Sequence, residues 1–483
     1  MANVQLLTSW ALLTGITIEP GVAVRSTGDT GLGVVYDGPG IAATDGEPSP
    51  FITVPADMII NSENIQRMAR SQPRLAALLA TAIDAYEPMP GEDAAAESRP
   101  LLDREIICRF LVYSMHDFKA DKHQHEQQGN IFRQFLAFYP REGVLTPTTW
   151  TEPERLLLAA TSIFRAVDAK RNKLESEFLA FEKVFSRVYP GESMTLHEYL
   201  LADFYISSRA MEMPSSTDRK VGLVPLVDFA NHRAHVETNC KYEYLADGSI
   251  ALVSVGRAVA AGDELVISYG DDKGAGEMLF SYGFVPAIET DDGFVADGAL
   301  KLRIVPELEE DRAKEYLLGK PAVLEIRQDG ASRTVEWTCD YLWLAIVGRR
   351  DGLELELVEL VTGEDELRLS YNGRVVDTRA ERWLDGLKQQ MHDRTDTVAD
   401  RTIGMWPVYY VRACVRVLEL IEHTLEVPRV ESDECRPAVV AVAEQCIAIE
   451  TKVLRQAQAT VRSQMETMYE AHRADIEWYM KHA

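Results

Sequence analysis

The chain has 483 residues. A single hydrophobic core stops growing at about 250–300 residues, so we expect two or three domains. Apolar residues make up 46% of the sequence and charged residues 26%, which excludes a wholly disordered or fibrous chain. The net charge of −26 disfavours nucleic-acid and membrane-surface binding and suits a basic protein partner, although an acidic surface also serves solubility alone.

Cysteine usage and hydropathy bear on the compartment. The six cysteines form no CxxC pair, so we expect neither a metal site nor a disulfide framework, and reduced thiols in an intracellular protein. Residues 1–18 lack a basic segment and carry polar residues across their middle, which argues against a secretory signal. No run reaches the roughly 18 apolar residues of a membrane span. We expect a cytoplasmic protein, with the nucleus as the alternative.

The N-terminal half changes from strand patterns to helix patterns. Residues 22–55 alternate short apolar runs with Gly, Asp and Pro turns, which predicts short strands. Residues 62–205 carry apolar side chains at helical spacing, interrupted by an acidic, Pro-rich tract at 87–100 that we interpret as a loop.

Strand patterns return between residues 220 and 305, with a hairpin predicted around Asp247-Gly248. Beyond Pro306 the chain reads as mostly helical, and acidic stretches at 307–316 and 353–360 are interpreted as solvated helix faces, with docking of a basic target as the alternative. Candidate buried positions there are Trp343, Leu357, Trp383, Val411, Leu418, Leu420, Val453 and Tyr469. The pattern predicts an α+β fold, with a β-rich domain interrupted by a helical insertion and followed by a mostly α-helical C-terminal domain.

A polar cluster follows an apolar run in LVPLVDFANH, which we interpret as a buried strand leading into Asp228, Asn231 and His232. Taken alone, this motif favours a turn with a partly buried histidine over a functional site. The segment AGDELVISYG predicts a turn and a strand ending at Tyr269, and GEMLFSYGFVP adds two aromatic rings, Tyr282 and Phe284.

In order and spacing these fragments resemble the SET-domain methyltransferases, whose two C-terminal signatures are an Asn-His pair and a Gly-Glu/Asp-Glu-Leu strand ending in tyrosine. Here the signatures are Asn231-His232 and Gly262-Asp263-Glu264-Leu265 through Tyr269.

More narrowly, the chain resembles the Rubisco large-subunit methyltransferase class, which lacks cysteine-rich zinc flanks and carries a large helical insertion. The pair Ser208-Arg209, the tripeptide Gly31-Leu32-Gly33 and the segment 146–174 match that class, although the tripeptide alone would indicate only a turn. The resemblance covers residues 5–305 and is most specific over 203–286.

The resemblance implies a SET domain built from residues 1–61 and 206–305 around a threaded C-terminal segment, with a helical insertion at 62–205. Residues 306–483 would form a helical domain of the substrate-binding type. The implied activity is transfer of a methyl group from S-adenosyl-L-methionine to a lysine of a non-histone protein. Ribosomal proteins, translation factors and metabolic enzymes are candidate partners, and we expect a monomer.

Site residues follow from the resemblance position by position. Tyr269 would be catalytic, orienting the amine and stabilising the polarised methyl group. Arg209 would meet the cofactor's carboxylate, although a surface charge is the alternative reading of this residue. The implied cofactor contacts are Thr30, Gly31, Leu32, Ser208, Arg209, Asn231, His232 and Tyr269.

Five residues are implied at the substrate channel. They are Met211, Val227, Asp228, Tyr282 and Phe284, with Ser208 also at the rim. A histidine-methylating branch of the family has asparagine and tryptophan at the positions of Met211 and Val227, and an apolar sleeve suits the methylenes of lysine better than an imidazole. Histidine methylation and a non-catalytic adaptor remain the alternatives, and a scaffold without any ligand would require the ordered motifs to be coincidental.

Overall fold

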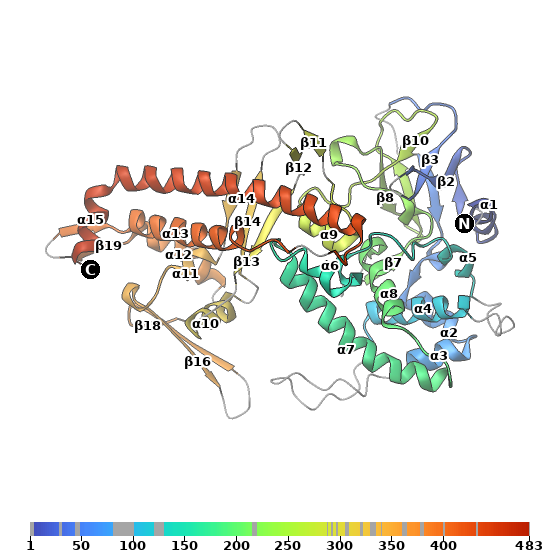
Figure 1. Cartoon of the computed structure of the whole chain (residues 1–483), viewed down its shortest axis with the longest axis horizontal. Helices are drawn as coiled ribbons and strands as arrows, with labels where there is room; N and C mark the ends of the chain where they lie inside the picture. The colour runs from blue at the N-terminus through green and yellow to red at the C-terminus, as the bar shows by residue number, and fades with distance from the viewer. Residues whose placement is uncertain are drawn as a thin grey trace. The chain divides into compact units, whose positions relative to one another are not determined.

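The structure is a computed structural model of the chain (Figure 1). It describes residues 4–28, 31–43, 49–80, 101–119, 130–214, 220–286, 288–290, 293–295, 298–304, 309–318, 322–328, 335–339, 341–359, 365–376, 381–398, 401–430 and 433–482. Within these ranges no helix combines the length and the apolar character needed to cross a membrane. The loop expected at 87–100 lies outside the described residues.

The chain folds into two compact units. The first comprises residues 1–151, 166–271 and 279–284, and the second comprises 152–165, 272–278 and 285–483. The segment boundaries expected at residues 61, 205 and 305 stay predictions, because one compact unit can combine several such segments.

Small antiparallel sheets form the β-rich part of the first unit. One has the strand order β1-β4-β9-β8, another β10-β3-β2, and a third β5-β7-β6. The strands are β1 (Thr17–Ile18), β2 (Val22–Ser26), β3 (Leu32–Tyr36), β4 (Pro50–Val54), β5 (Ile60–Asn61), β6 (Met211–Met213), β7 (Lys220–Leu223), β8 (Cys240–Tyr244), β9 (Ile250–Ser254) and β10 (Asp263–Leu265). Strands β2, β3 and β4 confirm the strands predicted within 22–55.

Two predictions for the segment after residue 220 have opposite outcomes. The hairpin is confirmed, since β8 pairs with β9 and Gly248 adopts φ +83° in the turn. The strand prediction for 223–230 is wrong, because β7 ends at Leu223 and a 3-10 turn, η6 (Val227–Phe229), follows. Pro225 cannot donate to a sheet, and Leu226 takes the left-handed backbone at φ +69°, so the buried apolar run turns instead of extending.

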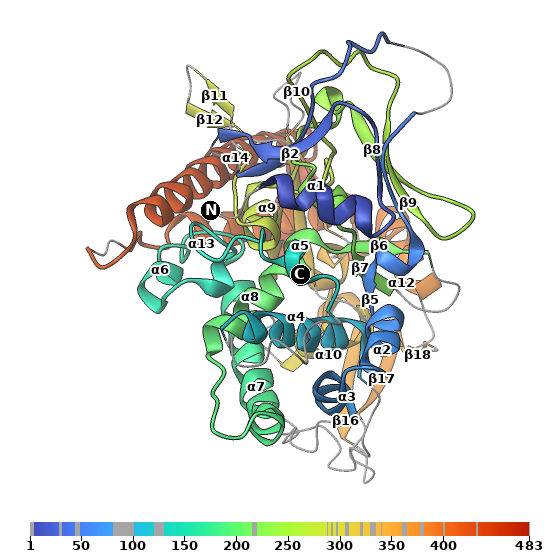
Figure 2. The same cartoon turned by 90° about the vertical axis from the view of Figure 1, so that its right-hand side faces the viewer.

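Helices pack together in the first unit (Figure 2), with α2, α3 and α4 in mutual contact and α8 beside α4. Its helices are α1 (Val4–Leu13), α2 (Ser62–Ala69), α3 (Pro73–Ala80), α4 (Asp103–Lys119), α5 (Arg133–Leu136) and α8 (Leu196–Arg209), together with most of α7 (Phe164–Val188). Thr195 and Glu198 form a reciprocal capping box that begins α8, the helix that ends at Arg209.

Aromatic packing joins the N-terminal helix to the segment after α5. The rings of Trp10 and Phe135 stack at 5.4 Å, and Phe135 lies 5.1 Å from Tyr139 and 5.8 Å from Phe229 of η6. Such ring pairs stabilise a fold beyond their buried area. Residues 130–139 are thereby held against η6.

The second unit contains both helices and strands. Its helices are α6 (Glu152–Leu156), α10 (Glu309–Leu318), α11 (Leu342–Ala345), α12 (Glu381–Asp393), α13 (Trp406–Leu425), α14 (Pro437–Ala471) and α15 (Arg473–His482), and α9 (Ala275–Tyr282) is shared with the first unit. Its strands are β11 (Ile288–Thr290), β12 (Gly293–Val295), β13 (Ala299–Arg303), β14 (Val323–Gln328), β15 (Val335–Thr338), β16 (Leu353–Glu359), β17 (Asp365–Tyr371), β18 (Arg374–Val375), β19 (Thr395–Val398) and β20 (Arg401–Gly404).

The helical interpretation of 353–360 is wrong, because Leu353–Glu359 forms β16 and pairs with β17 along its full length. Leucines alternate with glutamates there, and this period of two belongs to a strand with one apolar face. Candidate buried position Leu357 therefore lies on a strand. Leu418 and Val453 are buried in the second core as expected.

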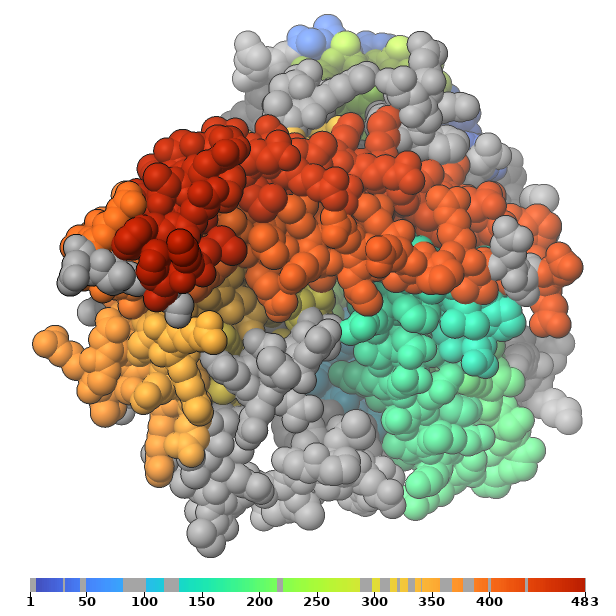
Figure 3. Space-filling model, turned by 60° about the vertical axis from the view of Figure 1, so that its left-hand side comes forward, coloured from blue at the N-terminus to red at the C-terminus, as the bar shows by residue number. Residues whose placement is uncertain are grey.

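Helices α13 and α14 lie side by side, as the orange and red surfaces of Figure 3 show. Their buried positions recur every four residues, at Ala413, Val417 and Ile421 on α13 and at Val453, Ala457 and Val461 on α14. Small residues among them permit close approach of the two helices.

Two carboxylates attach the segment 152–165 to α14 within the second unit. Glu154 accepts from Nε and Nη2 of Arg436 at 2.6 and 3.0 Å, and Glu450 accepts from the backbone N and the Oγ of Ser162 at 2.7 Å each. Burial raises the pKa of Glu450 to about 7. Gly276 lies against the same carboxylate, where a Cβ would stand 2.4 Å from Oε1 of Glu450.

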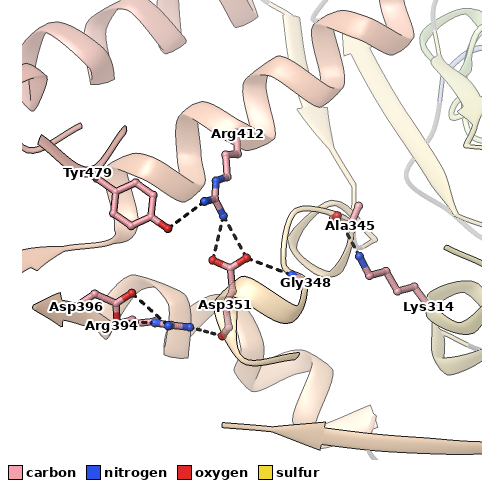
Figure 4. A network of polar contacts seen from close by, with 8 residues as sticks. All are labelled: Lys314, Ala345, Gly348, Asp351, Arg394, Asp396, Arg412 and Tyr479. Atoms are coloured by element: carbon pink, nitrogen blue, oxygen red, sulfur yellow. Dashed lines mark hydrogen bonds and ion pairs between the residues drawn. The ribbon is translucent and has the colours of Figure 1, made fainter. Parts of the chain in front are cut away.

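A buried carboxylate also joins three elements of the second unit (Figure 4). Asp351, 4% exposed, accepts two hydrogen bonds from Nη1 of Arg412 at 3.0 and 3.2 Å and one from the backbone N of Gly348 at 3.2 Å. Arg412 in turn donates to the hydroxyl of Tyr479 at 3.2 Å. The C-terminal helix α15 is thus connected to α13 and to the turn before β16.

We expect Asp351→Ala to destabilise the second unit by about 2–4 kcal/mol, because it leaves Arg412 without its counter-charge in a largely buried site. The midpoint of thermal unfolding should fall by about 5–10 °C, measured by circular dichroism. The control is Glu419→Ala, which removes an exposed ion pair with Arg416 and should change stability by less than about 1 kcal/mol. Equal effects of the two variants would contradict the role given to Asp351.

Candidate active site

The two sequence signatures meet side by side in the first unit. His232 forms a parallel bridge with Ile267. The backbone N of Ile267 donates to the carbonyl of Asn231 at 3.0 Å, and the backbone N of Arg233 donates to the carbonyl of Ile267 at 3.1 Å. This pairing places Tyr269, two residues beyond the bridge, against the Asn-His pair.

Tyr269 is held by both its backbone and its hydroxyl. Its backbone N donates to Nδ1 of His232 at 3.1 Å, which fixes the imidazole, and its hydroxyl donates to the carbonyl of Ala230 at 2.9 Å. Burial raises the pKa of Tyr269 well above its usual value, an effect that Arg209 opposes. The phenol is therefore neutral at physiological pH.

Three further rings surround Tyr269. Tyr282 lies 4.6 Å from it between ring centroids, Phe284 lies 6.4 Å away, and His232 lies 5.2 Å away on the other signature. Tyr282 also directs its hydroxyl to the carbonyl of Tyr269 at 3.4 Å. The aromatic residues expected at the substrate channel thus gather around the expected catalytic tyrosine.

Asn231 connects this region to the N-terminal strands. Its Nδ2 donates to Oε1 of Glu264 at 2.6 Å and lies 3.4 Å from the carbonyl of Leu32. Gly33 leaves the room for this contact, since a Cβ there would stand 2.4 Å from Oε1 of Glu264 and 2.8 Å from Nδ2 of Asn231. Gly31 adopts φ +86°, and a Cβ there would meet nothing within 4 Å.

Arg209 lies between two rings at the end of α8. Its guanidinium is 4.7 Å from the ring centroid of Tyr139 and 5.3 Å from that of Phe229. Nη1 donates to the backbone carbonyl of Asp228 at 3.0 Å and is 3.8 Å from the carboxylate oxygen Oδ2. The side chain is 17% exposed, which disfavours the alternative of a simple surface charge.

The carboxyl group of Asp228, which the resemblance implies at the substrate channel, is fully buried and faces Arg209. The hydroxyl of Tyr139 donates to Oδ2. Burial raises the pKa of Asp228 to about 6, while Arg209 and the bond from Tyr139 act in the opposite direction. Among the described residues, Oδ1 of Asp228 and Nε of Arg209 are buried without a hydrogen-bond partner.

The remaining expected site residues are placed as follows. Val227 is fully buried in η6 and Met211 is 9% exposed on β6, while Oγ of Ser208 donates to the carbonyl of Phe204 at 2.7 Å. Thr30 lies outside the described residues. Over the described part of the chain, acidic, histidine and cysteine side chains form no group of three that could hold a metal ion.

Two residues of the site, Tyr139 and Glu264, are not predicted as site residues by the sequence. Tyr139 comes from the helical insertion, 89 positions before its partner Asp228, and nothing local in the sequence marks it. The sequence marks Glu264 only as part of the second signature, whereas in the structure its carboxylate accepts the hydrogen bond that holds Asn231. Its position beside the turn at Gly262 was the one available signal.

The chain is similar in sequence to known proteins. No family model matches the sequence. SET domain-containing protein 8 of Schizosaccharomyces pombe is 30% identical over 232 residues, which span 47% of this chain and 51% of that protein. The chloroplastic Rubisco large-subunit N-methyltransferase of Pisum sativum is 24% identical over 176 residues, 34% of this chain and 35% of that protein. The chain thus spans about half the length of the first curated relative and about a third of the second.

Solved structures extend the likeness to almost the whole chain. The SET domain of LSMT bound to lysine and AdoHcy has a TM-score of 0.62 at 17% identity, covering 97% of this chain and 93% of that one. Rubisco LSMT bound to AdoMet has a TM-score of 0.59 at 18% identity, with the same coverage.

The sequence match and the shared fold together show that the chain resembles the SET-domain methyltransferases. Within that class it has the Rubisco LSMT fold, a SET domain with a helical C-terminal region. The resemblance and the α+β fold class predicted from the sequence are both confirmed.

We expect Gly33→Ala to disturb the contact between Asn231 and Glu264, because the added methyl group has no space beside either side chain. The cost should be about 1–3 kcal/mol of stability, measured by thermal unfolding. The matched control is Gly40→Ala, where a Cβ would meet only a carbonyl oxygen at 3.8 Å and stability should stay within about 0.5 kcal/mol of the unmodified chain. A Gly33→Ala variant of unchanged stability would show that the site accommodates a larger side chain than the structure leaves room for.

Proposed function

We propose that the chain transfers a methyl group from S-adenosyl-L-methionine to a lysine side chain of another, non-histone protein. The observation that carries this proposal is the position of Tyr269, whose neutral phenol lies beside the Asn-His pair and the rings of Tyr282 and Phe284, within the electrostatic reach of Arg209. The likeness to LSMT structures bound to lysine and AdoHcy or to AdoMet supports it.

The residues present fit this cofactor. Arg209 is an always-charged donor with a buried Nε that has no partner among the described residues, suited to a carboxylate. A Cβ built at Gly31 would meet no atom within 4 Å, so the backbone there is open to a ligand. Asn231, which precedes His232, lies close by, with its Nδ2 3.4 Å from the carbonyl of Leu32. When bound, the cofactor supplies an electrophilic methyl group on a positively charged sulfur.

Tyr269 acts by orientation. A phenol whose pKa is raised by burial does not ionise near neutrality, so it is not the base that accepts the lysine proton. Its ring and those of Tyr282 and Phe284 form a wall of aromatic surface, and low hydration beside such a wall favours the neutral amine. Near-attack placement of the amine contributes on the order of several kcal/mol to the rate.

The lining at Met211 and Val227 favours lysine over histidine. Both side chains are apolar and at least nine-tenths buried, so they give an imidazole no hydrogen-bond partner. A non-catalytic adaptor would have no need of the ordered Tyr269 hydroxyl. A cytoplasmic location and a monomeric state complete the proposal.

We expect Tyr269→Phe to lower the methylation rate by about 100-fold or more while changing cofactor affinity only slightly, because the hydroxyl acts at the reacting centre. Purified protein, radiolabelled S-adenosylmethionine and an extract of its source organism give the measurement, and mass spectrometry locates the label. The control is Tyr242→Phe, which alters a more exposed tyrosine on β8 and should keep full activity. Cofactor binding without any labelled protein across several extracts would favour the adaptor.

We expect Met211→Asn to lower kcat/KM for the lysine substrate by about tenfold, because it places a polar amide against the methylenes of the lysine. Met211→Leu keeps the apolar surface and should cost less than about threefold. Steady-state methylation of the identified substrate measures both variants. Label found on histidine in the unmodified protein's product would contradict the lysine assignment directly.

A further inference from the structure

Tyr139 belongs to the helical insertion, yet it contacts both charged residues of the cofactor site. Its hydroxyl donates to Oδ2 of Asp228, and its ring lies 4.7 Å from the guanidinium of Arg209. Burial raises the pKa of Tyr139 well above its usual value, so the phenol stays a neutral donor. Tyr139 therefore contacts both members of the Arg209–Asp228 charge pair, with its hydroxyl as a neutral hydrogen-bond donor.

Charge balance decides which form of Asp228 suits the cofactor. S-adenosylmethionine carries a carboxylate, an ammonium and a sulfonium, so its net charge is positive. With Asp228 ionised, the pair with Arg209 is neutral; with Asp228 protonated, Arg209 leaves an uncompensated positive charge in a buried site. A cationic ligand binds the first arrangement better than the second.

We propose that Tyr139 is a positioning residue for cofactor binding: its hydroxyl keeps Asp228 ionised, and ionised Asp228 holds Arg209 in place and balances its charge. This inference rests on the proposed function, since it assumes that Arg209 receives S-adenosylmethionine. It assigns to the insertion a direct part in the cofactor site.

The groups around Asp228 give the direction of the pH dependence. Among the described residues, the titratable and charged groups that face it are Arg209 of α8, Tyr139 and Tyr269, with Tyr205 behind Tyr139. The pKa of Asp228 is raised to about 6, so the carboxyl is ionised above that pH and protonated below it. Loss of the bond from Tyr139 removes an effect that lowers this pKa, so protonation should begin at higher pH.

The test compares Tyr139→Phe with the unmodified full chain by isothermal titration calorimetry with S-adenosylmethionine at pH 7.5 and pH 6.0. Because the variant should protonate Asp228 at higher pH, we expect affinities equal within about 1.5-fold at pH 7.5 and about fivefold weaker binding by the variant at pH 6.0. Any contribution of His232 is common to both proteins. S-adenosylhomocysteine lacks the sulfonium charge, so its binding should depend less on pH.

Tyr205→Phe is the matched control. It removes a neighbouring hydroxyl that donates to the carbonyl of Pro140 at 3.0 Å, and its ring lies 4.9 Å from Tyr139. Its pH dependence should equal that of the unmodified protein. The inference would be overturned if Tyr139→Phe bound S-adenosylmethionine more weakly by the same factor at both pH values. It would also be overturned if the variant bound no more weakly at all, or bound more tightly on acidification. If the unmodified protein binds no S-adenosylmethionine at either pH, the proposed function fails instead, and the inference falls with it.

Discussion

The parallel pairing of His232 with Ile267 is the constraint on which the site depends. It joins two segments that lie 35 positions apart and that are otherwise short, irregular pieces of backbone. The backbone of Tyr269 then holds the ring of His232, and the hydroxyl of Tyr269 reaches Ala230. Because each contact fixes a partner of the next, the site is ordered by main-chain pairing before any ligand contributes.

Buried charge is the second organising element. Three elements meet here: α8 carries Arg209, the turn η6 carries Asp228, and the segment after α5 carries Tyr139. The rings of Tyr139 and Phe229 enclose the guanidinium. An arginine in such surroundings is costly unless its counter-charge and its aromatic faces are all present. Leu226, two residues before Asp228, has a positive φ, which is a costly conformation for a leucine and persists because the side chain is buried in the core.

Much of the site could be predicted from the sequence because its residues lie in short motifs. Asn231, His232 and Tyr269 were found from order and spacing, and they do come together. Tyr139 could not be found, since its partner is remote in the chain and a tyrosine in a helical tract is usually core. At β16 the acidic composition indicates a solvated helix face, but the leucines alternate with a period of two, and that period decides for a strand. Pro225 was a similar signal against a continuous strand.

The attachment of residues 152–165 to α14 has a consequence for synthesis and for engineering. The chain passes between its two compact units after residues 151, 165, 271, 278 and 284, so neither unit is formed by one continuous stretch of sequence. Glu450 and Arg436 leave the ribosome almost 300 residues after Ser162 and Glu154, their partners. These two contacts can therefore form only after residues 436 and 450 have been synthesised. A truncation after residue 305 would remove Arg436 and Glu450, and with them both of these contacts.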